Sequence, residues 1–181
     1  MRRYTLATLV AAATLAGLSA PQAIAAASPT SQDRTFLVQA HQGNLAEIAA
    51  GKDAGKHATT VCVKRAGQTW VHDHTKLDAS VRKLADKTHT RLPSSPSAAQ
   101  QKALQAVQSK AGSSAYDEAW LKAQAAAHRK TLAAIDQEIK HGTNSGVVAA
   151  ARTARPMVAM HLDMVRDGVC HQAPHSTHHA S

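Results

Sequence analysis

The sequence predicts an all-α protein built as a bundle of four long helices. The clearest sign is a set of side chains that recur every seven residues between positions 63 and 88, accompanied by a second set offset by four. This spacing places both sets on one face of a single amphipathic helix. The first set is Val63, Trp70, Leu77 and Leu84, and the second is Gly67, His74, Val81 and Thr88. A length of 181 residues suits one domain with a substantial core.

Turn-forming residues separate four stretches of helical periodicity. We expect long helices over residues 33–54, 57–87, 114–140 and 145–168, with a short Ala/Gln-rich helix over 97–110. Ser31 or Asp33 is placed to cap the first helix, and Gly55 is placed to end it. Pro93 and Pro96 stop the second helix.

The N-terminal 25 residues have the pattern of a secretory signal peptide. Arg2 and Arg3 form a basic start, residues 6–18 are apolar, and small residues at 23 and 25 predict cleavage near Ala25. No later stretch is apolar enough to span a membrane, so we expect a secreted or otherwise extracytoplasmic protein. The predicted segments are a signal peptide (1–25), a lead-in (26–32), the bundle (33–170) and a disordered His-rich tail (171–181).

The charge of the chain limits the classes of partner. The formal charge is +9, and it falls to +7 without Arg2 and Arg3. This basicity is compatible with cell-wall polyanions or a membrane surface as partners, but a solvated basic surface is the favoured explanation. Aromatic residues are few and are not interleaved with Lys or Arg, which argues against specific nucleic-acid binding. We expect a monomer or a weak homodimer.

Two cysteines, Cys62 and Cys170, are present in this chain. An isolated pair in an exported protein forms a disulfide more often than it remains as two thiols. The sequence therefore predicts a Cys62–Cys170 bridge.

Several metal-binding side chains fall near the middle of the long helices. Because mid-helix positions meet in a bundle, we expect one group of candidate ligands for zinc, copper or iron. This group is Glu47, His74, His128 and His161, with His41 as a fifth member. The pair His72 and His74 does not chelate one ion, because helical residues two apart point in opposite directions.

A buried polar network is the competing interpretation of the same side chains. Glu47 would pair with His74 or His128, and neighbouring polar residues would satisfy the remaining groups. The further members of this network are Asn44, Asp73, Asp117 and Gln124. The Glu-x-x-His pattern of di-iron bundles is missing at the two inward histidines, since positions 71 and 158 are both Val.

A set of short motifs in a fixed order resembles the domain of unknown function 4142 family over about residues 33–169. The motifs are Phe36 with Glu47 eleven residues later, Trp70-Val-His-Asp-His74, Tyr116-Asp117 followed by Gln124 and His128, and Arg155-Pro156 followed by His161-Leu162. The resemblance implies an exported, ferritin-like helical bundle. It implies no agreed activity.

The connection over residues 90–113 decides the chain path. A plain up-and-down bundle needs only a few residues there, whereas these 24 are enough to climb the length of a long helix. If the connection climbs, the second and third long helices run parallel, as in ferritin-like folds. Cys62 and Cys170 then lie at the same end, whereas a plain bundle would place them too far apart to bond.

Three hypotheses for function follow from these observations. The first is a structural or stress-related envelope protein whose interior cluster binds a metal. The second is a metal-dependent redox enzyme, and the third is a basic adhesin for cell-wall polyanion or a membrane surface. No nucleophile motif or phosphate-binding loop is present in the sequence, so we lean against catalysis.

Overall fold

The computed structural model describes residues 28–171, and all regular structure in this range is helical. The predicted signal peptide and all but the first residue of the predicted tail lie outside the described residues. The elements are α1 (Ser31–His57), α2 (Val61–Lys87), α3 (Ala98–Gln108), α4 (Ser114–His141), α5 (Ser145–Val165) and a 3₁₀ turn, η1 (Arg166–Gly168). The all-α prediction is confirmed. Within residues 28–171, no helix combines the length and apolarity needed to cross a bilayer.

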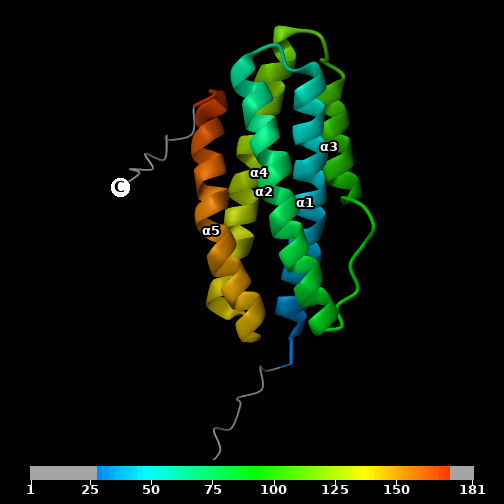
Figure 1. Cartoon of the computed structure of the whole chain (residues 1–181), viewed down its shortest axis with the longest axis vertical. Helices are drawn as coiled ribbons and strands as arrows, with labels where there is room; N and C mark the ends of the chain where they lie inside the picture. The colour runs from blue at the N-terminus through cyan, green and yellow to red at the C-terminus, as the bar shows by residue number, and fades with distance from the viewer. Residues whose placement is uncertain (1–27, 172–181) are drawn as a thin grey trace, which may run out of the picture.

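Four long helices lie side by side, and the shorter α3 lies along the outside of the bundle (Figure 1). In that view α1 and α5 run upward, while α2 and α4 both run downward. The segment between α2 and α4 climbs back along the bundle, first as an extended stretch and then as α3, which packs against α1 and α4. The parallel direction of α2 and α4 depends on this long connection.

The helix ends near the start of the chain differ from the prediction. Thr30, rather than Ser31 or Asp33, is the N-cap of α1, and its backbone N–H donates to the carboxylate of Asp33 in a capping box. Helix α1 continues past Gly55, and α2 begins four residues later than predicted. Ala58 takes an extended conformation (φ −62°, ψ 143°), and the Thr60 side chain then caps α2.

A disulfide joins the start of α2 to the segment after α5. Helix α5 ends at Val165, three residues earlier than predicted, because Arg166 has a non-helical ψ of 148°. Asp167 then adopts a left-handed conformation with φ 59°. The chain then brings Cys170 to Cys62, with their Cα atoms 6.2 Å apart. The predicted bridge is confirmed, and both cysteines lie at the same end of the bundle.

Two glycines allow α1 and α2 to approach closely. A Cβ atom at Gly51 would lie 2.5 Å from the carbonyl oxygen of Gly67, and a Cβ at Gly67 would lie 2.7 Å from the carbonyl oxygen of Gly51. Any larger residue at either position would push the two backbones apart. This contact keeps the inward face of α1 against α2.

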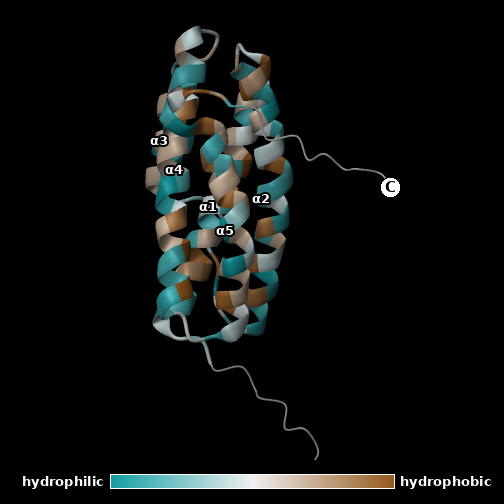
Figure 2. Ribbon diagram, turned by 90° about the vertical axis from the view of Figure 1, so that its left-hand side faces the viewer, coloured by the Kyte–Doolittle hydropathy of each residue, from teal (hydrophilic) through white to brown (hydrophobic). Residues whose placement is uncertain are grey.

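The core consists of two apolar clusters with a polar layer between them. Figure 2 shows hydrophobic and hydrophilic stretches alternating along each long helix. One cluster includes Trp70, Ala125 and Met164, and the other includes Val81, Ile135 and Val158. In α2, α4 and α5 one buried histidine falls between the residues of the two clusters: His74 in α2, His128 in α4 and His161 in α5. The polar layer therefore lies inside the bundle.

Candidate metal centre

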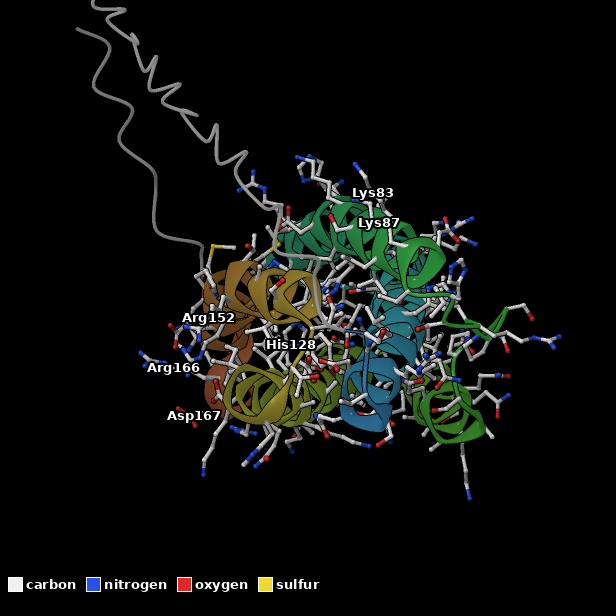
Figure 3. All side chains as sticks on the ribbon, turned by 90° about the horizontal axis from the view of Figure 1, so that it is seen from below. Lys83, Lys87, His128, Arg152, Arg166 and Asp167 are labelled. Atoms are coloured by element: carbon white, nitrogen blue, oxygen red, sulfur yellow. A yellow bond between two sulfur atoms is a disulfide. The ribbon has the colours of Figure 1, made fainter. Side chains whose placement is uncertain are left out.

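Three histidines from three different helices meet in the polar layer. One ring nitrogen each from His74, His128 and His161 lies within 4.8 Å of the other two. The ring centroids are 5.7 Å (His74–His128), 5.2 Å (His74–His161) and 5.4 Å (His128–His161) apart. All three residues are at most 3% exposed. In the end-on view of Figure 3, His128 lies between the helices, whereas Lys83 and Lys87 lie on the outside.

The second nitrogen of each ring is bonded to an oxygen acceptor. The Nδ1–H of His74 donates to the side-chain Oδ1 of Asn44 on α1, across 2.9 Å. The Nδ1–H of His128 donates to the main-chain carbonyl of Gln124, one turn earlier on α4, also across 2.9 Å. These bonds fix the orientation of both rings and leave the Nε2 lone pairs available.

His161 is oriented by a carboxylate instead of a neutral oxygen. Its Nε2–H donates to Oδ2 of Asp73 across 2.9 Å, and Oδ1 of Asp73 accepts from the exposed His72 across 2.8 Å. Although burial alone would raise the pKa of Asp73, the bonds from His72 and His161 hold that pKa below its usual range. Asp73 is therefore ionised at neutral pH.

Three buried nitrogens remain without a hydrogen-bond partner: Nε2 of His74, Nε2 of His128 and Nδ1 of His161. Each is the ring nitrogen opposite the one bonded to oxygen. An unpaired polar atom inside a protein is costly, so three together require a physical reason. A carboxylate–histidine or carbonyl–histidine bond on the far nitrogen, with a free near nitrogen, is the usual arrangement of histidines that bind metals.

Burial keeps the three imidazoles neutral. Removal from water lowers the pKa of His74 well below its ordinary value, and the neighbouring His128 and His161 lower that pKa further. Burial lowers the pKa of His128 to about 3, and it also lowers the pKa of His161 although Asp73 opposes that shift. Neutral imidazole is the metal-binding form, so no proton has to leave these rings near pH 7.

Trp70 forms one wall of the centre. Its ring stacks on His161 with centroids 4.3 Å apart and an interplanar angle of 18°, and it lies 5.1 Å from the ring of His128. The indole Nε1–H donates to Oε1 of Gln124 across 2.9 Å. These contacts restrict the rotation of two of the three imidazoles.

Glu47 is a buried carboxyl on the same face of α1 as Asn44, one turn further along. It is 7% exposed, and its Oε2 has no hydrogen-bond partner. Burial raises the pKa of Glu47 to about 8, and interaction with the Trp70 side chain only partly opposes this shift. A hydrogen bond between Glu47 and His74 or His128 was expected. Instead, His74 donates to Asn44, and His128 donates to the carbonyl of Gln124. Glu47 does not belong to the three-histidine group.

Comparison with sequence families adds a classification. The sequence model of a family described as a domain of unknown function, DUF4142, matches residues 18–167. The chain belongs to this family. The DUF4142 match spans α1 to α5 and contains the three histidines of the centre. Searches of curated proteins and of solved structures gave no match.

Two further candidates in this DUF4142 chain lie away from the three histidines. His41 bonds through Nδ1 to Asp78 (2.6 Å) and through Nε2 to the carbonyl of Pro93 (2.9 Å), so both its ring nitrogens are engaged. Asp117 accepts the backbone N–H groups of residues 59 and 60, each across 2.8 Å, at the start of α2. His41 is therefore buried between α1, α2 and the long connection. Asp117 stabilises the N-terminus of α2.

Asp53, Asp78 and Glu138 are buried acids that helical periodicity did not single out, and Asp53 accepts a hydrogen bond from the hydroxyl of Tyr116. Asp78 lies one turn after His74 on the same face of α2, and this spacing could have identified it. Glu138, in the last turn of α4, is fully buried, and its Oε2 accepts a hydrogen bond from Gln32 (3.1 Å). Burial, followed by the nearby carboxylate of Asp33, raises the pKa of Glu138 to about 7. The signal for Glu138 was weak, because its partners come from the opposite end of the sequence.

Proposed function

We propose that the protein is an exported, ferritin-like helical bundle that binds one transition-metal ion through His74, His128 and His161. One observation supports this most strongly. Each imidazole has one nitrogen fixed by an oxygen acceptor and the other buried, unpaired and close to its two counterparts. A purely structural polar network would be expected to pair these nitrogens with each other or with nearby acids.

The spacing of the three nitrogens suits an ion after a small contraction. A point equidistant from three nitrogens at most 4.8 Å apart lies no more than about 2.8 Å from each. A Zn–N bond is about 2.0–2.1 Å long, so each ring has to move by less than about 1 Å. Imidazole ligands suit zinc, copper and iron, and these three are the candidate ions.

The donor set favours a single ion over a di-iron centre. Di-iron bundles use carboxylates from all four helices, with two Glu-x-x-His pairs. Among residues 28–171, the group of side chains close enough to share an ion contains three histidines and no carboxylate. A role in metal binding within an envelope protein therefore fits better than oxygen chemistry at two irons.

Two observations support the proposed fold class and the proposed extracytoplasmic localisation. The parallel α2 and α4, joined by a long crossing connection, match the chain path expected of ferritin-like bundles (Figure 1). The Cys62–Cys170 disulfide is typical of an oxidising compartment outside the cytoplasm. A signal peptide over residues 1–25 is the remaining part of this proposal.

Metal analysis of untagged protein tests the proposal. The purified chain is dialysed against zinc, copper or iron, and bound metal is measured by mass spectrometry. We expect about one equivalent of at least one ion, and a higher melting temperature because the ion binds only the folded state. The variants His74→Ala and His128→Leu should each lose that equivalent.

Two controls separate the centre from weak surface binding. His72→Ala removes an exposed histidine two residues from His74 and should retain the metal. A variant without His175, His178 and His179 removes three of the four histidines in residues 171–181 and should also retain the metal. Less than a tenth of an equivalent in wild type, unchanged in His74→Ala, would leave the polar network as the correct account.

A further inference from the structure

The cations of the protein are unevenly distributed among its long helices. In α1 and in α4 the Lys and Arg residues are equal in number to the Asp and Glu residues, whereas α2 has six cations and three acids. The six cations are all exposed: Lys64, Arg65, Lys76, Arg82, Lys83 and Lys87. Solvation of a basic surface explains a net charge, but it gives no reason for the excess to lie on one helix.

The exposed cations of α2 are not neutralised by neighbouring carboxylates. Asp73 and Asp78 are bonded to histidines, and Asp86 is the one exposed acid of this helix. Within residues 28–171, the ion pairs that involve a Lys or Arg both lie outside α2: Lys122–Glu118 and Arg155–Asp136. The positive charge on α2 therefore faces water without a partner in the protein.

Four of these cations form a line along the outer face of α2, which we call the cationic line: Arg65, Lys76, Lys83 and Lys87. At about 100° and 1.5 Å per residue, they lie within about 40° of one another around the helix axis and extend over about 33 Å. Helix α2 packs on α1 and α5, while α3 packs on α1 and α4. Figure 3 shows Lys83 and Lys87 projecting outward from α2, whereas Arg152 and Arg166 lie on another side of the bundle.

The side chains around the cationic line limit the class of partner. A helix that lies on a membrane places Trp, Phe or Leu beside its cations, but Thr69, Ala79 and Ser80 accompany this line. Single-stranded nucleic acids stack their bases on exposed aromatic rings. The Phe, Trp and Tyr residues between positions 28 and 171 are all buried: Phe36, Trp70, Tyr116 and Trp120. The line therefore offers charge alone, which suits a polymer that has neither bases nor a bilayer surface.

We propose that the cationic line of α2 binds a flexible linear phosphate polymer. Such a polymer carries charge along its whole backbone, and a flexible chain can follow a straight helix face. Lys binds phosphate as a point charge that requires no fixed orientation, and the guanidinium of Arg65 adds a second kind of phosphate donor. This proposal does not depend on the metal centre, whose histidines are buried inside the bundle.

Fluorescence anisotropy of end-labelled inorganic polyphosphate tests the proposal. Untagged, metal-free protein is titrated at pH 8, where exposed histidines are neutral. If about four phosphates are neutralised, the logarithm of the binding constant should fall with log salt at a slope of about −3, which is roughly a 50-fold loss between about 50 and 200 mM salt. Lys76→Gln/Lys83→Gln/Lys87→Gln should bind at least about tenfold more weakly at about 50 mM salt, with a slope of about −1.

The matched control removes the same number of charges from α4. Arg129→Gln/Lys130→Gln/Lys140→Gln replaces three exposed cations and has the same net charge as the α2 triple variant. Because α2 and α4 pack on α1 and α5 and not mainly on each other, the salt solution screens these charges from the cationic line. The control should bind polyphosphate within about threefold of wild type.

Three outcomes would overturn the proposal. The first is no saturable binding of polyphosphate by wild type at low salt. The second is an equal loss of affinity in the two triple variants, because net charge and not the cationic line would then be responsible. The third is tighter binding of single-stranded DNA, or of vesicles of phosphatidylcholine and phosphatidylglycerol in equal parts, than of polyphosphate.

Two further variants keep this test separate from folding and from metal binding. Circular dichroism checks that both triple variants fold. If the α2 triple variant does not fold, Lys83→Gln alone should still make the salt slope less steep by about 0.7, and an unchanged slope would overturn the proposal. His128→Leu removes a candidate metal ligand and should bind polyphosphate as wild type does, so failure of the proposed metal binding leaves this result unaffected.

Discussion

His161 on α5 donates a hydrogen bond from Nε2 to Oδ2 of Asp73 on α2, across 2.9 Å. This bond links the two helices at the level of the centre and turns the Nδ1 of His161 toward the other histidines. It also places a carboxylate behind a ring that would hold a metal, an arrangement that raises the basicity of the ligand.

Asp73→Asn is therefore expected to weaken metal binding. The amide keeps the shape of the side chain but removes its charge, and loss of such an outer carboxylate typically costs about 10–100-fold in affinity. The affinities for Zn²⁺ and Cu⁺ should both fall, because the carboxylate acts on the ring of His161 and not on one particular ion. Chelator competition measures both affinities.

His72→Ala is the matched control for Asp73→Asn. It removes the other partner of Asp73 while leaving the bond to His161 intact. An affinity loss in His72→Ala as large as in Asp73→Asn would contradict an orienting role for the bond between α2 and α5.

The close contact between α1 and α2 gives a second prediction. Gly51→Ala places a methyl group 2.5 Å from the carbonyl oxygen of Gly67, and the overpacking should lower the free energy of unfolding by about 1–3 kcal/mol. Gly43→Ala, in the same helix with no atom within 4 Å of the added Cβ, should raise it by about 0.5–1 kcal/mol. Urea unfolding compares the two. Equal effects would show that the backbones can separate without cost.

The convergence of the three histidines could be predicted from the sequence because it depends only on position along the helices. His74 and His128 lie near the middle of α2 and α4, and His161 lies one turn before the end of the shorter α5. All three face inward, so packing of the helices brings them to one level. Their tautomers could not be predicted. Which oxygen each ring bonds depends on the rotation of each helix about its axis, which helical periodicity specifies too coarsely.

His41 shows a different limit. Its inward orientation was predictable and it is buried, at 6% exposure. One of its partners is the carbonyl of Pro93, in an extended connection whose path no periodicity specifies. Its other partner, Asp78, satisfies the ring without any ion, so His41 has no unpaired nitrogen to offer the centre.

The buried carboxyl of Glu138, in the last turn of α4, gives a prediction about the pH dependence of stability. The pKa of Glu138 is about 7 in the folded state, above its ordinary value of 4.5. The folded protein therefore binds more protons than the unfolded chain between these values, and stability from this group falls as pH rises through that window. Glu138→Gln, which stays neutral, should remove this part of the fall.

Urea unfolding of wild type and Glu138→Gln at pH 5 and pH 8 checks this sign. Relative to wild type, Glu138→Gln should be more stable at pH 8 than at pH 5. Glu118→Gln, at an exposed residue paired with Lys122, should not gain relative stability between the two values. If Glu138→Gln loses relative stability on going to pH 8, Glu138 is ionised in the folded protein and the direction of its pKa shift is wrong.

Removal of the Cys62–Cys170 disulfide tests how much this bond, between the start of α2 and the segment after α5, contributes to stability. Cys62 and Cys170 are 108 residues apart in the sequence, so their bond closes one loop from α2 to the segment after α5 in the unfolded state. The double variant Cys62→Ser/Cys170→Ser should lose about 3–5 kcal/mol of unfolding free energy, measured by urea unfolding without added metal. Because the three histidines lie on α2, α4 and α5 away from this end, the folded variant should keep its metal affinity within about threefold. A larger loss of affinity would mean that the bond also sets the spacing of α2 and α5 at the centre.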